Sequence, residues 1–172
     1  SIIVPSVSSD RREYIPIGFL DKDTIISNLG LAIYDADPWI FAVLTSKMHT
    51  NWVAAIGGRL GNGYRYSAEI CYNTFPIPDL TDKQKQTLTS HVYNILEERE
   101  KYPEKTMAEL YDPDKMPTGL KEAHHNLDLA VERCYRSKPF TNDEERLEYL
   151  FKLYEKMINE ERLKVSNSTP LK

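Results

Sequence analysis

The chain of 172 residues is long enough for one domain or two small ones, and its formal net charge is −4 at pH 7. Its 41% hydrophobic and 28% charged residues are typical of a soluble globular protein, so affinity for DNA or a membrane must come from a local patch. The longest apolar run, 39–44, is too short to span a bilayer. Cys71 and Cys134 lack the spacing of a disulfide scaffold or a zinc site, which favours the cytoplasm.

The first part of the sequence predicts short strands joined by polar turns. Strands are expected at 2–4, 14–20 and 31–34, and turns at 8–13, 21–23 and 27–30. The chain starts without Met, inside the first of these strands, so we expect it to be a fragment of a longer protein.

A helix is predicted to follow, with Asp37 as its N-cap and Pro38 at its first position. The glycine pair at 57–58 would end it in the left-handed conformation. The spacing places Lys47 and His49 outside the buried face. That face is expected to contain Phe41, Leu44, Met48 and Trp52. A loop or hairpin tip at 59–67 and a strand at 68–75 complete this part.

The second half predicts helices. Thr81 and Gln84 form a capping box for a helix that ends before Pro103, and a short helix is expected at 107–111. Thr118 and Asn142 are predicted to cap two further helices, and 166–172 to form a frayed tail. The predicted fold class is α+β, with a mixed α/β module of short strands at 1–80 and an all-α helical bundle at 81–172.

The stretch 45–67 contains Lys47, Arg59 and Arg65 without a single Asp or Glu. Arginine presents a planar fork of donors that matches O6 and N7 of guanine or two phosphate oxygens. The residues alone leave two interpretations open. The stretch contacts nucleic acid, or it is a solvated hairpin tip whose arginines pair with nearby acids.

Catalytic motifs are absent from the sequence. A methyltransferase needs a glycine-rich turn after its first strand, and one acting on an exocyclic amine needs an NPP[YF]-type loop, whereas 37–39 is Asp-Pro-Trp. No lysine has an acidic residue two positions before it, which excludes the common (D/E)xK nuclease motif. We therefore predict no catalytic residue, no metal site and no cofactor in this chain.

Several blocks nevertheless resemble a known family. They are PSVSSDRREYIPIGFL, IYDADPWIFAVLTSKMH, GGRLGNGYRYSAEICYNTFPIPDLT, ELYDPDKMPTGLKEAH and ERCYRSKPFTNDEERLEYLFKLYEKM. Together they resemble the C-terminal part of the MmeI-like DNA methyltransferases, the single-chain type IIG restriction–modification enzymes.

The resemblance implies a parent protein with an N-terminal nuclease and an adenine-N6 methyltransferase core that uses S-adenosylmethionine, and a nuclease that would use Mg²⁺. In this chain, 1–80 would be the C-terminal half of the target-recognition domain and 81–172 the helical C-terminal domain. The expected partners are double-stranded DNA and the methyltransferase core of the same parent chain, with no membrane.

In such enzymes the residues between GRL and YRYS read bases, which here implies Gly61, Asn62, Gly63 and Arg65. The turn at 27–30, represented by Asn28, is a second patch. Many members carry long polar side chains where this sequence has the two glycines. Either Asn62 and Arg65 do the reading, or one base pair is left unread, or the backbone reads it.

Our hypothesis from sequence is a non-catalytic piece that docks in the major groove of DNA. Arg65 would make the discriminating base contact and Asn62 would pair with adenine, while Arg59, Lys47 and His49 would contact phosphates. The alternative is a helical protein-interaction module with no direct DNA contact.

Overall fold

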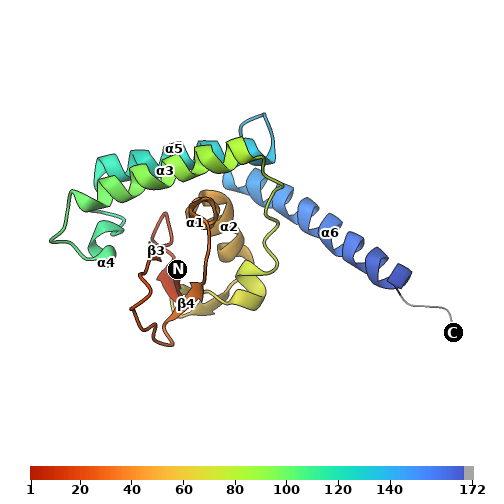
Figure 1. Cartoon of the computed structure of the whole chain (residues 1–172), viewed down its shortest axis with the longest axis horizontal. Helices are drawn as coiled ribbons and strands as arrows, with labels where there is room; N and C mark the ends of the chain where they lie inside the picture. Colours follow the sequence, from red (N-terminus) through yellow and green to blue (C-terminus); the bar gives the residue numbers. More distant parts are fainter. Residues whose placement is uncertain (169–172) are drawn as a thin grey trace.

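The computed structural model describes the backbone of residues 1–168 and side chains through residue 164. Two small antiparallel sheets lie on one side of the molecule and long helices on the other (Figure 1). The first sheet has the order β3-β1-β4, with bounds Gly18–Phe19, Ile2–Pro5 and Gly30–Ile33. The second has the order β2-β6-β5, with bounds Val7–Ser9, Gly63–Arg65 and Gly58–Leu60. The predicted α+β class is confirmed.

The strand expected at 14–20 shortens to β3. Pro16 has no N–H to donate, and Ile17 N instead donates to Ile15 O at 2.8 Å, which makes a tight local turn. Ile15 and Ile17 are buried all the same. The polar stretch at 8–13, predicted as a turn, begins inside β2, where Ser8 is only 5% exposed. Pairing with a distant strand thus overrides the local turn signal.

The helix predicted from Pro38 is two helices, α1 (Pro38–Thr45) and α2 (Lys47–Ile56). Ser46 separates them in an extended conformation, and its Oγ donates to Val43 O at 2.7 Å. The same oxygen accepts from the N–H of His49 as the N-cap of α2. Gly57, expected to be left-handed, is extended at φ −64°, so that prediction was wrong.

The prediction of a strand at 68–75 is also wrong, because a π-helical turn, η1 (Ala68–Tyr72), occupies its place. Ser67 caps this turn by accepting from Ile70 N at 3.2 Å, and Asn73 N closes it on Ala68 O at 2.8 Å. Cys71 is fully buried inside the turn.

The remaining helices are α3 (Asp82–Glu100), α4 (Met107–Leu110), α5 (Thr118–Tyr135) and α6 (Asp143–Ser168). The capping box of Thr81 is confirmed, as is the cap of Asn142, whose Oδ1 accepts from Glu145 N at 2.8 Å. Thr118 is the first residue of α5 rather than its cap, because Pro117 occupies the N-cap position. Of the tail predicted at 166–172, the first three residues continue α6 and the last four lie outside the described residues.

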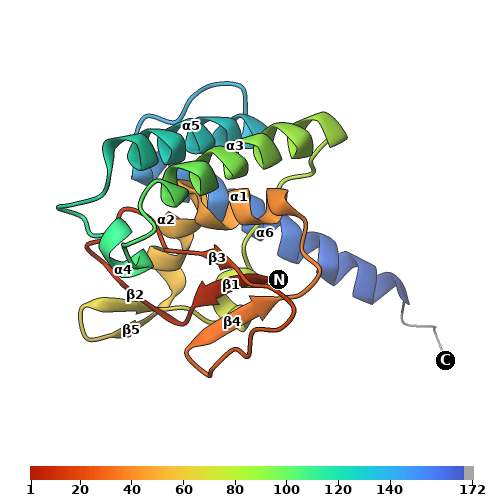
Figure 2. The same cartoon turned by 60° about the vertical axis from the view of Figure 1, so that its left-hand side comes forward.

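Helices α1 and α2 lie between the two sheets and the antiparallel pair α3–α5, as both views show (Figure 2). One apolar core runs through all these layers. The first turns of α6 pack on α2, where Trp52 contacts Phe151 and Tyr154 at ring-centroid distances of 5.1 and 5.5 Å, and the rest of α6 projects from the body. Within residues 1–168, no helix is long and apolar enough to cross a membrane.

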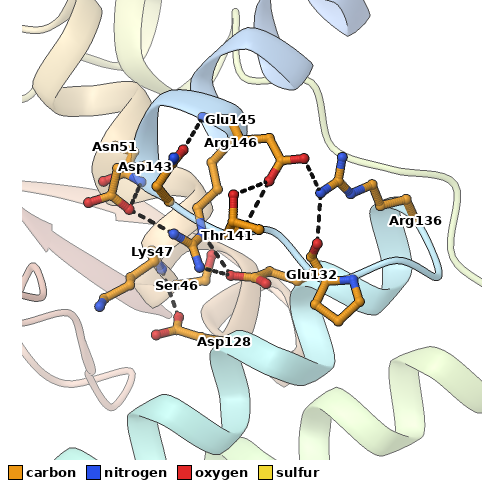
Figure 3. A network of polar contacts seen from close by, with 12 residues as sticks. Ser46, Lys47, Asn51, Asp128, Glu132, Arg136, Thr141, Asp143, Glu145 and Arg146 are labelled. Atoms are coloured by element: carbon orange, nitrogen blue, oxygen red, sulfur yellow. Dashed lines mark hydrogen bonds and ion pairs between the residues drawn. The ribbon is translucent and has the colours of Figure 1, made fainter.

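A polar network fastens the helical half to α2 (Figure 3). Arg146 of α6 lies 2.7 Å from the buried carboxylate of Glu132 and donates to Asp143 at 2.9 Å. Asp143 also accepts from Asn51 of α2 at 2.7 Å, and Asp128 of α5 accepts from the N–H of Lys47 at 2.8 Å. We call these five side chains, with the Lys47 N–H, the helical seam. It fixes where α2, and the hairpin that follows it, stand relative to α5 and α6.

Candidate nucleic-acid interface

The predicted site lies on the hairpin formed by β5 and β6. Gly58 is paired with Arg65, Arg59 with Tyr64 and Leu60 with Gly63, which leaves Gly61 and Asn62 as the tip. Strand β2 pairs along the other side of β6 and places Val7 beside Arg65. The hairpin therefore has one free edge, β5, and an exposed tip.

The two glycines that depart from the resembled family serve the hairpin backbone. Gly61 has φ +58°, the left-handed region that glycine enters without strain. A Cβ at Gly63 would lie 2.9 Å from the carbonyl oxygen of Ser8, so a side chain there would push β2 away. The exposed polar side chain left between them is Asn62.

Alternation along the strands separates the two arginines. Arg59 shares its face with Tyr64, and its guanidinium lies 4.7 Å over the ring centroid of Tyr64. Its Nη1 is also 3.6 Å from Asp10 Oδ2. The charge of Arg59 is thus partly neutralised. This agrees with the interpretation of 45–67 as a solvated hairpin tip whose arginines pair with nearby acids.

Arg65 lies on the opposite face and is exposed. Among the described side chains it has no hydrogen-bond or ion-pair partner. It lines a groove of about 630 Å³ together with Asn28, Leu29, Leu60 and Glu69. The structure therefore brings the two predicted patches, the turn at 27–30 and the hairpin, to one surface. We call the hairpin and this groove the recognition edge.

A short set of backbone contacts positions the turn. Leu29 O accepts from both the N–H and the Oγ of Ser6 at 2.9 Å, and Gly30 N donates to Ser27 O at 3.2 Å. Ser6 also accepts from Tyr66 N at 2.9 Å, so one residue between β1 and β2 links the turn to the hairpin. The position of Asn28 relative to Arg65 is thus set by hydrogen bonds on Ser6.

The prediction that His49 lies outside the core is wrong. His49 is fully buried, with Nε2 2.8 Å from the hydroxyl of Tyr66 and its ring edge-on to Phe75 at 4.5 Å. Burial lowers the pKa of His49 to about 3, so the imidazole is neutral at physiological pH. The helix restarts after Ser46 and η1 covers α2, which together turn His49 inward. A buried neutral ring is unsuited to the predicted phosphate contact.

Lys47 is half-buried and bound to the protein itself. Its ammonium lies 2.8 Å from Glu13 Oε1. Burial alone would lower the pKa of Lys47, but the hydrogen bond and charge of Glu13 outweigh it and raise that pKa. Lys121 approaches the other oxygen of Glu13 at 3.2 Å. A phosphate contact by Lys47 would have to displace Glu13.

Sequence reasoning missed the apolar residues that line the groove and the one acid in its lining. Val7, Leu29 and Leu60 are 41%, 70% and 58% exposed around Arg65, and Glu69 lies at the groove wall. These residues come from four separate segments. One of them, β2, overlaps the stretch 8–13, which the sequence predicts to be a polar turn. The sequence contains no local signal that would bring them together.

The described residues 1–168 contain no group of three His, Cys, Asp or Glu side chains able to hold a metal ion. The passage from β4 to α1 runs through Tyr34–Asp37 without a glycine, so this strand-to-helix turn lacks the backbone that cradles S-adenosylmethionine. This turn does not fit that cofactor.

Comparison with known proteins gives matches over nearly the whole chain. The family model of the MmeI target recognition domain matches residues 1–79, and that of the MmeI C-terminal domain matches residues 80–161. DNA methyltransferase A of Bacillus subtilis (strain 168) is 54% identical over 157 residues, which are 91% of this chain and 18% of that protein.

The structure is also similar to that of the type IIL restriction-modification enzyme MmeI, solved in complex with DNA. The TM-score is 0.88 and the sequence identity 42%, over 92% of this chain and 21% of that one. The chain thus spans about a fifth of the length of these relatives. The predicted subtype, IIG, stays a prediction. The chain belongs to the MmeI family of restriction-modification DNA methyltransferases, as the region of the target recognition domain followed by the C-terminal domain.

Proposed function

We propose that this chain is the non-catalytic, DNA-reading part of a longer site-specific DNA adenine-N6 methyltransferase. One observation carries the proposal. Arg65, an exposed arginine without a partner among the described side chains, lies in the same groove as Asn28, on the domain that matches target recognition. A base-reading arginine has to be free of internal partners, because each existing ion pair would compete with the base for its donors.

In the proposed complex, the fork of Arg65 binds O6 and N7 of a guanine in the major groove. Asn62 pairs with an adenine from the tip, and Asn28 contacts the neighbouring pair. Arg59 is exposed, and its ion pair with Asp10 is long at 3.6 Å, so it can bind a phosphate on the outer face of the hairpin. The glycines at 61 and 63 allow the tip backbone to approach the duplex closely.

We assign the chemistry to the rest of the longer protein. The methyl donor S-adenosylmethionine, the transfer to adenine and any Mg²⁺-dependent cleavage would belong to domains outside this chain, in a cytoplasmic enzyme. Residues 1–80 would then read the target, while residues 81–172 would hold the recognition edge against the methyltransferase core.

The test compares Arg65→Ala with Arg59→Ala in the full-length enzyme, by titration of duplexes that carry each single base-pair change in the target. Arg65→Ala should cost about 1–3 kcal/mol on the target duplex and remove discrimination at one base pair. Arg59→Ala should weaken target and non-target duplexes alike and reduce the salt slope of binding by about 1.

The two variants act as controls for each other, because both remove one positive charge from the same hairpin. If Arg65→Ala weakened all duplexes equally, Arg65 would be a phosphate contact. If it changed neither affinity nor discrimination, the proposed base reading would be wrong, and the helical protein-interaction module would be favoured instead.

A further inference from the structure

A second groove lies between α3 and α5, in the helical half. It has a volume of about 400 Å³, which falls in the range of small-molecule sites, about 300–1,000 Å³. Each helix contributes side chains at i, i+3, i+4 and i+7, so the groove follows two facing helical stripes. The stripes consist of Gln84, Thr87, Leu88 and His91 on α3 and of Asn126, Leu129, Ala130 and Arg133 on α5.

The charged residues that line this groove are cations. Lys83 and Arg133 both line it, whereas no Asp or Glu does. Neither cation has an ion-pair partner among the described residues. Six other cations of the same half are paired with carboxylates, namely Lys101, Lys121, Arg136, Arg146, Lys152 and Lys156. The groove therefore presents two charges that no acid of the described residues neutralises.

His91 lines the same groove about two helical turns along α3 from Lys83, and it has no hydrogen-bond partner among the described residues. Its Nδ1 is buried without a hydrogen bond, so Nε2 is the ring nitrogen that a ligand in the groove can reach. Burial, and then the charge of Arg133, lower the pKa of His91. A bound anion would oppose the second effect and favour the imidazolium, which would donate to it.

The groove also has an apolar wall. Leu88 is fully buried at its floor, and burial raises the pKa of the Cys134 thiol, so this thiol is neutral. The hydroxyl of Thr87 and the amides of Gln84 and Asn126 add neutral polar groups to the lining. Cations, neutral hydrogen-bonding groups and an apolar wall together suit a phosphate that is attached to a less polar body.

We propose that the α3–α5 groove binds a phosphate group through Lys83, Arg133 and His91, either of a nucleotide or of a nucleic-acid backbone. Helices α1 and α2 lie between this helix pair and the sheets that contain the recognition edge (Figure 2). The phosphate would therefore be separate from the bases that Arg65 contacts. The inference does not depend on the proposed function, because it uses none of the recognition-edge residues.

The 172-residue chain itself is suitable for the test. Inorganic phosphate, deoxyadenosine monophosphate and a 20-base-pair duplex are each titrated while NMR follows the imidazole C–H signals of the histidines. The His91 signal should shift saturably and its pKa should rise, while exposed His125 serves as an internal reference. The Lys83→Gln/Arg133→Gln double variant should bind at least about tenfold more weakly, since it loses two charge-assisted hydrogen bonds.

The three ligands separate the possible sources of the phosphate. Equal binding of phosphate and nucleotide would support a site for the anion alone, tighter nucleotide binding would support use of the apolar wall, and binding of the duplex alone would support a backbone contact. Lys138→Gln is the matched control, because Lys138 is exposed and outside the groove. Saturable binding to none of them, or binding that the double variant retains in full, would overturn the proposal. Arg65→Ala should leave the His91 titration unchanged even if the recognition edge does not read bases.

Discussion

The recognition edge and the helical seam both depend on arginine, and they use it in opposite ways. In the seam, Arg146 is only 14% exposed and has two carboxylate partners, Glu132 and Asp143. At the edge, Arg65 is exposed and has no partner among the described residues. Charges that hold the fold are paired within it, and a charge available to a ligand is left without an internal partner. On this basis, Arg146 is assigned to the stability of the fold and Arg65 to ligand binding.

The largest expected effect comes from breaking the seam. Arg146→Ala leaves Glu132, 4% exposed, without its counter-charge, and should lower the free energy of unfolding by about 3–5 kcal/mol. Lys152→Ala is the control, because its pair with Glu148 is exposed and should contribute at most about 0.5 kcal/mol. Urea unfolding of both variants measures the contrast. A loss below about 1 kcal/mol for Arg146→Ala would show that the seam does not hold the fold.

A smaller loss is expected where the hairpin meets α2. Tyr66→Phe removes the hydroxyl that bonds His49 Nε2 at 2.8 Å and leaves a buried imidazole with no partner on either nitrogen. The free energy of unfolding should fall by about 1–3 kcal/mol. Tyr93→Phe, at an exposed position of α3, should change it little. Equal effects of the two substitutions in urea unfolding would contradict a structural role for the His49–Tyr66 bond.

Acid should lower the free energy of unfolding through the same buried residue, His49. The pKa of His49 is about 3 in the folded protein and about 6.5 when unfolded, so between these values the unfolded chain binds the extra proton. The contribution of the neutral His49 ring to the free energy of unfolding is complete above about pH 6.5. It is lost as the pH falls toward 3, by about 1.4 kcal/mol per pH unit well below 6.5.

Asp128 has the opposite effect. Burial raises its pKa to about 7, so the unfolded chain ionises this carboxyl first and the free energy of unfolding falls as the pH rises from about 3.8 to 7. The two contributions can be separated with His49→Gln, which removes one titration and leaves Asp128. When the pH falls from 5.5 to 4.5, the free energy of unfolding should change more favourably in the variant than in the parent chain, by about 1.4 kcal/mol per pH unit, because the loss due to His49 is removed. Identical slopes would contradict the neutral state of His49.

The smallest effect is expected at the hairpin tip. A Cβ at Gly61 meets no atom within 4 Å, so Gly61→Ala adds only the strain of φ +58°, about 1 kcal/mol. Gly61→Asn should cost less, since asparagine tolerates this conformation better. Thermal unfolding would rank the two variants. A larger loss for asparagine than for alanine would show that the tip is constrained by more than its backbone.

Local signals in the sequence predicted the helical half well. The capping box at Thr81 and the cap at Asn142 act within one helical turn, so they are read from neighbouring residues and the structure confirms them. The burial of His49 was not predictable in this way. It follows from the break at Ser46 and from η1, where the expected strand is replaced by a turn that packs on α2.

The candidate site was predictable only in part. Arg65 and Asn28 were chosen through the family resemblance, and the groove that joins them depends on β2, whose pairing with β6 is long-range. Val7 and Leu60 enter the site through that pairing. The sequence interpretation gave Arg59 and Arg65 different roles, but it could not place their side chains on opposite faces of the hairpin, because that placement needs the strand register.

Arg65 is proposed to read a base, whereas the helical seam is expected only to hold the fold. Sequencing of the modified sites in DNA methylated by the full-length enzyme tests this contrast most directly, with wild type, Arg65→Ala and Arg146→Ala compared at a temperature where all are folded. The target of Arg65→Ala should become degenerate at one base pair, whereas that of Arg146→Ala should stay unchanged. An unchanged target for Arg65→Ala would contradict base reading by Arg65.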